Sequence, residues 1–219
     1  MDRNETVTTE VIVYGAGGHA KVVIDALERS GRYAVRAVVD DDPAAAGRVL
    51  LDRYRVVSGT DPTLLQPARG TVAMVAIGSN PGRRRVFEGL QRQGFSFATA
   101  VHPAAAVAVD AVLAEGTVVM AGAVVNSDAR IGRNVIVNTG ARVDHDCRVA
   151  DHVHLAPGSV LCGGVSIGED ALIGAGAVII PGIRVGARAT IGAGSTVLSD
   201  VEDDAIVAGS PARPVASRQ

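Results

Sequence analysis

Tryptophan is absent from this chain of 219 residues, and aromatic residues of any kind make up only 3% of it. The only lysine is Lys21. All six aromatic residues precede residue 98: Tyr14, Tyr33, Tyr54, Phe87, Phe95 and Phe97. Because later residues are mostly Val, Ile, Ala, Gly, Asp and Arg, the two parts must build different cores. We therefore expect two domains, at 1–100 and 101–219.

Several classes of protein are excluded by what else is scarce. Two cysteines, Cys147 and Cys162, are too few for a disulfide framework or a zinc site. A net charge of −2 gives no reason to expect nucleic acid or an anionic membrane as a partner. No apolar run reaches the roughly 18 residues of a transmembrane helix, and the start, MDRNETVTTE, has no signal-peptide pattern. We expect a cytoplasmic protein without a metal.

The first hundred residues alternate between strand and helix patterns. Segments rich in β-branched and aromatic residues predict strands at 11–14, 33–39, 54–57, 72–77 and 95–101. Helices are predicted over 18–30 and 82–93, with Pro81 suited to the first turn of the second. This alternation predicts a small Rossmann-like α/β domain, whose parallel sheet binds ligands at the carboxyl ends of its strands.

A glycine turn follows the first of these strands, in the segment VIVYGAGGHAKVV. Gly15 permits a tight turn, and Gly17 and Gly18 allow a ligand to approach the backbone. The helix that follows offers free N–H groups to a phosphate. His19 lies in this turn, and we expect it to contact a sugar or its phosphates; the alternative is that it caps the helix.

An acidic segment ends the next strand, where Asp40 and Asp41 are expected to face a ribose or a base. The alternative is a plain turn with a solvated acidic loop. NAD is disfavoured, because a dinucleotide usually needs two mononucleotide-binding halves and this domain has room for one.

The second domain is a six-residue repeat. From 101 to 202, seventeen consecutive hexads begin with Val, Leu or Ile, and the fifth place is small or apolar nearly throughout. This is the signature of a hexapeptide parallel β-helix in which the first and fifth places point inward. Such repeats wind left-handed, against the usual rule for parallel crossovers. Cys147 occupies a fifth place, so it is expected to pack in the core and not to act as a nucleophile.

Five motifs carry a resemblance that covers nearly the whole chain: GAGGHAKVV (15–23), VVDDDP (38–43), IGSNPGRRR (77–85), VNTGARVDHDC (137–147) and GSPAR (209–213). The chain resembles the sialic acid O-acetyltransferase group of hexapeptide-repeat sugar acetyltransferases. Within that group it is most similar to the N-acetyltransferases acting on UDP- and GDP-linked 4-amino-dideoxy sugars of the bacillosamine and perosamine pathways. The resemblance implies a homotrimer with acetyl-CoA bound between neighbouring β-helices.

The resemblance also implies roles for individual residues. His145 occupies a third place, which points outward, and matches the family's catalytic base; Asp146 would orient its ring. Many members have Glu where Asp146 stands, so this pairing depends on a shorter side chain. Asn138 and His154 match positions near the acetyl group and the acceptor amine. His102 and His152 are interpreted as surface residues.

For acetyl-CoA, Gly163 is the candidate near the acetyl group, one coil after His145. The pantetheine arm is expected near Ala175 and Ala193, and the phosphates near Arg184 and Arg188. The sequence thus predicts acetyl transfer to an amine of a nucleotide-linked sugar by direct attack. Two alternatives stay open: transfer to a sugar hydroxyl, and a non-catalytic β-helix scaffold that binds nucleotide-sugars.

Overall fold

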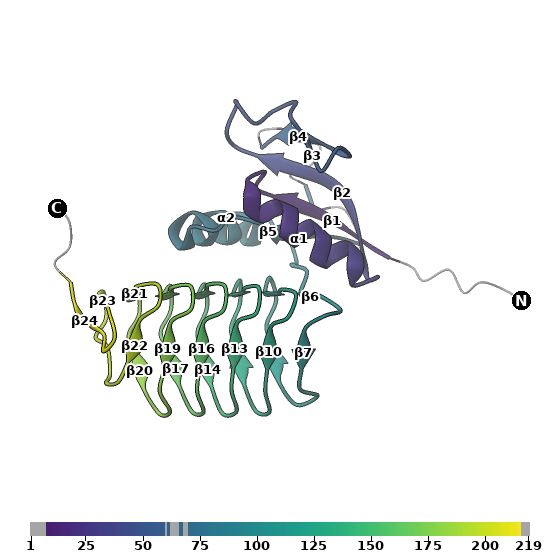
Figure 1. Cartoon of the computed structure of the whole chain (residues 1–219). Coiled ribbons are helices and arrows are strands. Elements are labelled where there is room, and N and C mark those ends of the chain that lie inside the picture. Colours follow the sequence, from purple (N-terminus) through teal and green to yellow (C-terminus); the bar gives the residue numbers. More distant parts are fainter. Residues whose placement is uncertain (1–7, 60, 62–65, 68–69, 216–219) are drawn as a thin grey trace, which may run out of the picture.

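The computed structural model describes residues 8–59, 61, 66–67 and 70–215. The first seven residues of the polar segment MDRNETVTTE and the end of the tail, 216–219, lie outside this description. An α/β domain lies on one face of a β-helix (Figure 1). The expected fold class, a small Rossmann-like domain followed by a left-handed parallel β-helix, is confirmed.

The α/β domain has a five-stranded sheet with one helix on each side. In chain order its elements are β1 (Thr9–Tyr14), α1 (Gly18–Arg29), β2 (Tyr33–Asp40), β3 (Val49–Leu50), β4 (Tyr54–Ser58), β5 (Thr71–Val75) and α2 (Asn80–Arg92). The strand order is β3-β4-β2-β1-β5, with only the short β3 antiparallel to its neighbour. Apolar residues of α1 pack on one face of this sheet and those of α2 on the other.

Four of the five predicted strands and both helices are confirmed. The strand predicted over 95–101 is wrong, because only Phe97 forms a bridge to the sheet, opposite Ala73. Its last two residues, Ala100–Val101, form β6, which belongs to the β-helix. Phe95 and Phe97 are buried against the sheet and α2, and Ala98 and Ala100 are buried where the two domains meet. Burial on its own therefore does not distinguish a connection from a strand.

The β-helix has three faces: one carries the α/β domain, and we name the other two by a residue type that is frequent on them. The docking face, which carries the α/β domain, consists of β6 (Ala100–Val101), β9 (Val118–Val119), β12 (Ile136–Val137), β15 (His154–Leu155), β18 (Leu172–Ile173), β21 (Thr190–Ile191) and β23 (Ile206–Ala208), with β24 (Arg213–Pro214) antiparallel at its end. The valine face consists of β7 (Ala106–Val107), β10 (Val124–Val125), β13 (Arg142–Val143), β16 (Val160–Leu161), β19 (Val178–Ile179) and β22 (Thr196–Val197). The arginine face consists of β8 (Val112–Leu113), β11 (Arg130–Ile131), β14 (Arg148–Val149), β17 (Ser166–Ile167) and β20 (Arg184–Val185).

The hexad pattern explains this prism. First-place residues such as Val143 and fifth-place residues such as Cys147 are fully buried in one continuous core, as predicted. The fourth place turns the corner in the left-handed backbone region, for example at Asp146 (φ 62°) and Gly164 (φ 70°). Only Gly and a few polar residues adopt that conformation readily, so the fourth place is rich in Gly, Asp and Asn.

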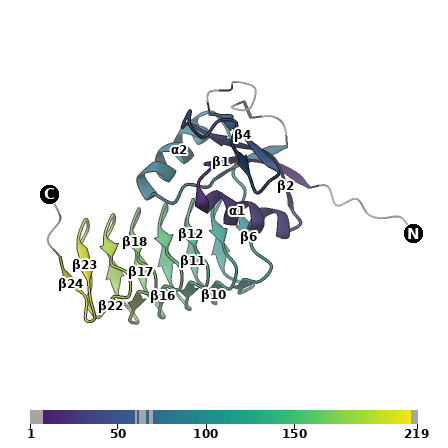
Figure 2. The ribbon, with the colours of Figure 1, turned by 45° about the horizontal axis from the view of Figure 1, so that its top comes forward.

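Two elements of the α/β domain dock on the β-helix. Helix α1 packs on the first coils through Ala20 and Leu27, against Met120 and Ile136 among others. Figure 2 shows α1 beside β6 and α2 on the other side of the sheet. At α2, the ring of Phe87 meets the edge of the His152 ring at 5.6 Å between centroids. His152 is 3% exposed, so its expected surface location is wrong.

His102, also expected at the surface, is only partly exposed. Its side chain is 12% exposed, and its Nε2 lies 3.3 Å from a carboxylate oxygen of Asp25 on α1. Its other ring nitrogen accepts a hydrogen bond from the backbone N–H of Ala104. Both histidines are thus buried by the docking of a helix, which no hexad position predicts.

The guanidinium of Arg83 links α2 to the β-helix. This side chain is 1% exposed and donates hydrogen bonds to the backbone oxygens of Asn134 at 3.1 Å and His152 at 2.6 Å. It also reaches the backbone oxygens of Ile77 and Gly78. Its acceptors in the described chain are uncharged oxygens, and burial lowers its pKa to about 10. These contacts fix the helix on the corner between the arginine and docking faces.

Replacing this side chain tests the link. Arg83→Met keeps much of the volume but leaves buried carbonyl groups without donors, so we expect the free energy of unfolding to fall by about 2–4 kcal/mol. Denaturant titration followed by circular dichroism measures it. The control is Arg92→Met, on an exposed position of the same helix, which should change little. An equal effect of both substitutions would contradict the role of Arg83.

Candidate functional site

His145 lies in the turn between β13 and β14, on the edge shared by the valine and arginine faces. Its Nδ1 is 2.7 Å from a carboxylate oxygen of Asp146, and its backbone N–H donates to Asp144 at 2.8 Å. The hydrogen bond to Asp146 and the charge of Asp144 raise the pKa of His145 above its usual value. When Nδ1 carries the hydrogen, the exposed Nε2 is free to accept a proton.

Gly163 lies directly beneath this imidazole, one coil further along the β-helix. A Cβ atom built on Gly163 would be 2.7 Å from Nε2 of His145, so a side chain here would displace the ring. In the part of the chain that the structure describes, the Gly163 N–H donates to no protein acceptor. A basic nitrogen and a free backbone donor are therefore side by side, as base-assisted attack on a carbonyl requires.

The glycine turn has the expected geometry. Gly15 has φ 113°, and a Cβ there would be 2.8 Å from the backbone oxygen of Ala76, so only glycine fits. Gly17 and Gly18 are exposed, and a Cβ at either would meet nothing within 4 Å. Within the described part of the chain, no side chain caps the start of α1, which leaves its N–H groups available to an anion.

The two acidic residues after β2 have different surroundings. The carboxylate of Asp40 accepts hydrogen bonds from the backbone N–H groups of Ala16, at 2.7 Å, and Asp42, at 2.9 Å. The bond to Ala16 holds the glycine turn against the end of β2. Asp41 accepts a hydrogen bond from the hydroxyl of Tyr14 and faces a separate small cavity.

Three residues expected near the acceptor meet at the docking face. Asn138 is buried, and its side-chain nitrogen is 3.1 Å from Nε2 of His154. The rings of His19 and His154 are 6.4 Å apart between centroids, and the buried Nε2 of His19 has no hydrogen-bond partner among the described residues. Burial, followed by neighbouring positive groups, lowers the pKa of each histidine to about 4. Both rings are therefore neutral at pH 7 and can exchange hydrogen bonds with a polar ligand.

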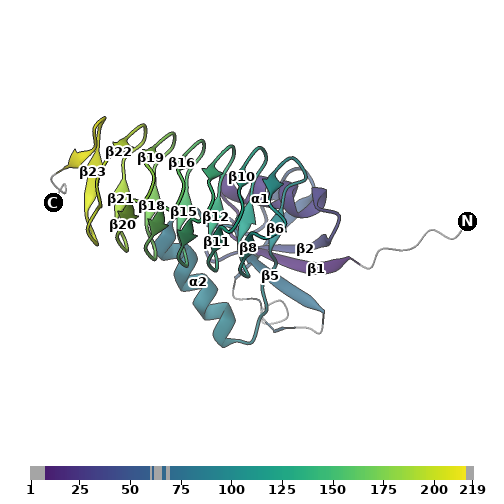
Figure 3. The same ribbon diagram turned by 90° about the horizontal axis from the view of Figure 1, so that it is seen from below.

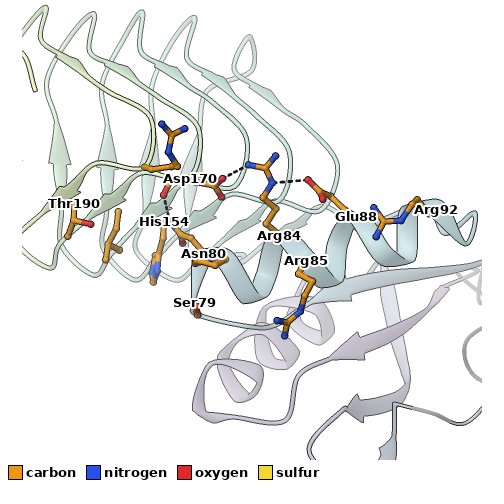
Figure 4. Close-up of a pocket in the computed structure, with 13 residues that line it drawn as sticks. Ser79, Asn80, Arg84, Arg85, Glu88, Arg92, His154, Asp170 and Thr190 are labelled. Carbon is orange, nitrogen blue, oxygen red and sulfur yellow. Dashed lines mark hydrogen bonds and ion pairs between the residues drawn. The ribbon is translucent and has the colours of Figure 1, made fainter. Parts of the chain in front are cut away.

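A cleft of about 860 Å³ opens beside His154, between α2 and the docking face (Figure 4). The start of α2 at Ser79 forms one end, and Leu172 and Thr190 form part of the floor. Arg84 bonds Glu88 and Asp170, whereas Arg85 points toward the α/β domain (Figure 4). Apart from His154 and Arg188, no lining residue was among the site candidates, although the arginine run 83–85 marks this helix in the sequence.

The residues expected to hold coenzyme A do not form one surface in a single chain. Gly163 is on the valine–arginine edge, whereas Ala175 and Ala193 are on the docking–valine edge. Arg184 projects from the arginine face 3.6 Å from Asp203, and Arg188 lies at the arginine–docking edge 2.6 Å from Asp204.

The catalytic candidates are likewise separated from the candidates for binding the acceptor. The turns that include His145 and Asp146 lie on the side of the β-helix away from the α/β domain, as Figure 1 shows and Figure 3 views from below. His19, Asn138 and His154 lie on the docking side. One chain therefore carries the two groups of candidate residues on different sides of its β-helix.

Neither a cluster of metal-binding side chains nor a membrane-spanning helix is present within the described residues. No group of three or more His, Cys, Asp or Glu side chains there could hold a metal ion. No helix there is long and apolar enough to cross a membrane.

Comparison with known proteins adds to this geometry. Residues 10–90 match the PglD N-terminal domain family, and residues 164–199 match the bacterial transferase hexapeptide family. The acetyltransferase domain of PglB from Neisseria gonorrhoeae is 37% identical, with a TM-score of 0.87, over 95% of this chain and 100% of that one. The chain belongs to the hexapeptide-repeat family of acetyl-CoA-dependent sugar acetyltransferases.

Two more members of this acetyltransferase family are similar. PerB from Caulobacter crescentus, solved with CoA and GDP-perosamine, is 44% identical with a TM-score of 0.85, over 94% of this chain and 97% of that one. UDP-N-acetylbacillosamine N-acetyltransferase from Bacillus subtilis is 36% identical over 121 residues, 51% of this chain and 51% of that protein. The match thus spans about half the length of this curated relative. The Neisseria domain has also been solved with acetyl coenzyme A.

The low pKa values of His19 and His154 predict acid sensitivity of this acetyltransferase. The unfolded chain binds a proton at each histidine near pH 6.5, and the folded chain only near pH 4. Acidification from pH 7 to pH 5 therefore favours unfolding, by about 1–2 kcal/mol per histidine. Denaturant titrations at several pH values should show this loss, and the free energy of unfolding should change less with pH in the His154→Gln variant. An unchanged pH dependence of the free energy of unfolding in His154→Gln would contradict the prediction.

Proposed function

We propose that the protein transfers the acetyl group of acetyl-CoA to an amino group of a nucleotide-linked 4-amino-dideoxy sugar. The observation that carries this proposal is His145, with one ring nitrogen bound to Asp146 and the other free above Gly163. Similarity to PerB, which binds CoA and GDP-perosamine, supports the substrate class.

The reaction then needs one base and one oxyanion donor. The sugar amine attacks the thioester carbonyl carbon while Nε2 of His145 takes a proton from the amine, and Asp146 stabilises the imidazolium. The carbonyl oxygen becomes an oxyanion that the N–H of Gly163 can stabilise. Collapse of this intermediate breaks the carbon–sulfur bond, and the departing thiolate receives the proton from His145. The acetyl group ends on the nitrogen, and CoA leaves as a thiol.

The docking side supplies the acceptor site in this proposal. The uncapped start of α1, with Gly17 and Gly18 exposed, suits a diphosphate. Asn138 and the neutral rings of His19 and His154 suit the hydroxyl groups and the neutral amine of a sugar, because each can donate or accept a hydrogen bond. The cleft beside His154 gives the sugar room.

His145 and the acceptor-binding candidates lie on different sides of one chain, so the proposed reaction requires a second chain. We propose a homotrimer. The valine face presents Val124, Val160 and Val178 between its two edges. A threefold axis along this face brings the His145 edge of one chain to the docking–valine edge of the next. Gly163 of one chain and Ala175 and Ala193 of its neighbour would then line one acetyl-CoA groove, with Arg184 as the candidate for its phosphates. Arg188, on the arginine–docking edge opposite the valine face, lies away from this groove.

A panel of acceptors tests the function itself. CoA release should occur with nucleotide-linked amino sugars and not with the matching hydroxyl sugars. Release with the hydroxyl sugars alone would show O-acetylation, and no release with any acceptor would favour a binding scaffold.

Substitutions at the base test the mechanism. His145→Ala should reduce the rate by about 10²–10⁴-fold without unfolding, because the side chain is exposed. Asp146→Asn should shift the acid limb of kcat/KM to lower pH, because Asp146 raises the pKa of His145. The control is Asp128→Asn, at the same hexad position one coil earlier and also left-handed (φ 54°). An unchanged limb in Asp146→Asn would contradict the pairing.

Mixed assemblies test the shared site. Gly17→Val should block the diphosphate without strain, because its Cβ position is open. His145→Ala and Gly17→Val chains, each inactive alone, should recover about a quarter of full activity when co-assembled at equal amounts, because random neighbours complete that share of sites. The native mass should be about three times 22.3 kDa. A fully active monomer, or no recovery on mixing, would contradict the trimer.

A further inference from the structure

The turn that carries His145 is held by a second carboxylate, besides that of Asp146. Oδ1 of Asp144 accepts a hydrogen bond from the backbone N–H of His145, at 2.8 Å. The same oxygen accepts a hydrogen bond from the side-chain amide of Asn126, at 2.9 Å. Asn126 occupies the same hexad place as Asp144, one coil earlier. The carboxylate of Asp144 is therefore fixed between the preceding coil and the backbone of the candidate base.

This arrangement is confined to the candidate site. Within the described residues 101–215, a side chain accepts a hydrogen bond from the N–H of the next residue at only two positions, Asn138 and Asp144. His145 and Gly163 both occupy third places on the same edge, one coil apart. Because Asp144 engages the N–H of His145, the N–H of Gly163 is the one of the two that is left for an oxyanion.

The charge of Asp144 acts on the imidazole through space. The hydrogen bond from Asn126, and after it the bond from the His145 backbone, lowers the pKa of Asp144 below its usual value. Asp144 is therefore ionised at neutral pH. The hydrogen bond to Asp146 is the first cause and the charge of Asp144 the second cause that raise the pKa of His145.

The turns of the two adjoining coils add no unpaired carboxylate in the described chain. In the preceding coil, Asp128 is paired with Arg130 at 2.8 Å and with Arg148 at 3.1 Å. In the following coil, the turn at 163–164 consists of two glycines and has no ionisable side chain. The two carboxylates of the His145 turn are therefore the negative charges that can stabilise its imidazolium form.

We propose that Asp144, anchored by Asn126, is a positioning residue for the base. Its hydrogen bond fixes the turn from which the imidazole projects, and its charge stabilises the imidazolium that forms as the acceptor amine attacks. Asp146 orients the ring by direct contact, so the two carboxylates have separate tasks. This inference rests on the proposed function, because His145 acts as a base only in that reaction.

Asp144→Asn tests the charge, because an asparagine oxygen can still accept the bond from the backbone. Without the negative charge, His145 loses its proton at lower pH. The acid limb of kcat/KM should therefore move to lower pH, and the plateau above it should fall by no more than about tenfold. The control is Asp110→Asn, an equal loss of charge on the same edge two coils earlier, which should leave the limb in place. An unchanged limb in Asp144→Asn would overturn the proposal.

Asn126→Ala tests the anchor. Asp144 keeps its charge in this variant and loses one of its two hydrogen bonds. The plateau of kcat/KM should therefore fall by about two- to tenfold, the equivalent of one hydrogen bond, while the acid limb stays at its wild-type pH. A wild-type plateau in Asn126→Ala would overturn the role of Asn126.

A titration without substrate separates this inference from the proposed function. The Cε1–H NMR signal of His145, assigned by its loss in His145→Ala, should titrate at lower pH in Asp144→Asn than in the wild type. A shifted titration in a protein that transfers no acetyl group would overturn the proposed function and leave the effect of Asp144 on His145 intact. An unshifted titration in an active enzyme would overturn the role of Asp144 alone.

Discussion

The position of α2 and of the cleft beside it depends on one buried cation, Arg83. Arg83 donates its hydrogen bonds to backbone oxygens of α2's own preceding loop and of two β-helix corners, at Asn134 and His152. A buried guanidinium is tolerated only where its donors are satisfied, so these corners and this helix specify one another. Because α2 cannot shift along the β-helix, the cleft, the neutral histidines and the glycine turn keep fixed positions on the docking face.

The same docking determines how the candidate site residues are distributed over one chain. The α/β domain covers the docking face (Figure 1), whereas His145 lies in the turn between β13 and β14, on the opposite edge of the prism. A β-helix is rigid, since each coil bonds the next along its length, and no bending brings the two edges together. In the homotrimer that we propose, the site is shared between chains: His145 and the Gly163 N–H lie on one edge of the prism, and the polar side chains of Asn138 and His154 lie on the docking side.

Local features were predictable because they depend on local rules. The hexad period fixes which side of its own coil a residue faces, which is why the core position of Cys147 and the exposure of His145 follow from the spacing alone. The glycine turn follows from the steric demand at Gly15, where a Cβ has no room. The strand predicted over 95–101 was wrong for the complementary reason: its apolar residues indicate burial, and here burial comes from packing against α2 and against the second domain, without strand pairing along the segment.

The sequence by itself determined the two architectures, the inward and outward places of the repeat, and the pairing of His145 with Asp146. Only the tertiary structure decided that His152 is buried, that Asp40 serves the turn while Asp41 faces a cavity, and that His145 and His154 lie on opposite sides. These outcomes rest on contacts between residues far apart in the chain, such as Arg83 with Asn134 and His152, 51 and 69 positions away. A periodic pattern encodes the direction of a side chain relative to its own coil, and it carries no information on which face another domain will cover.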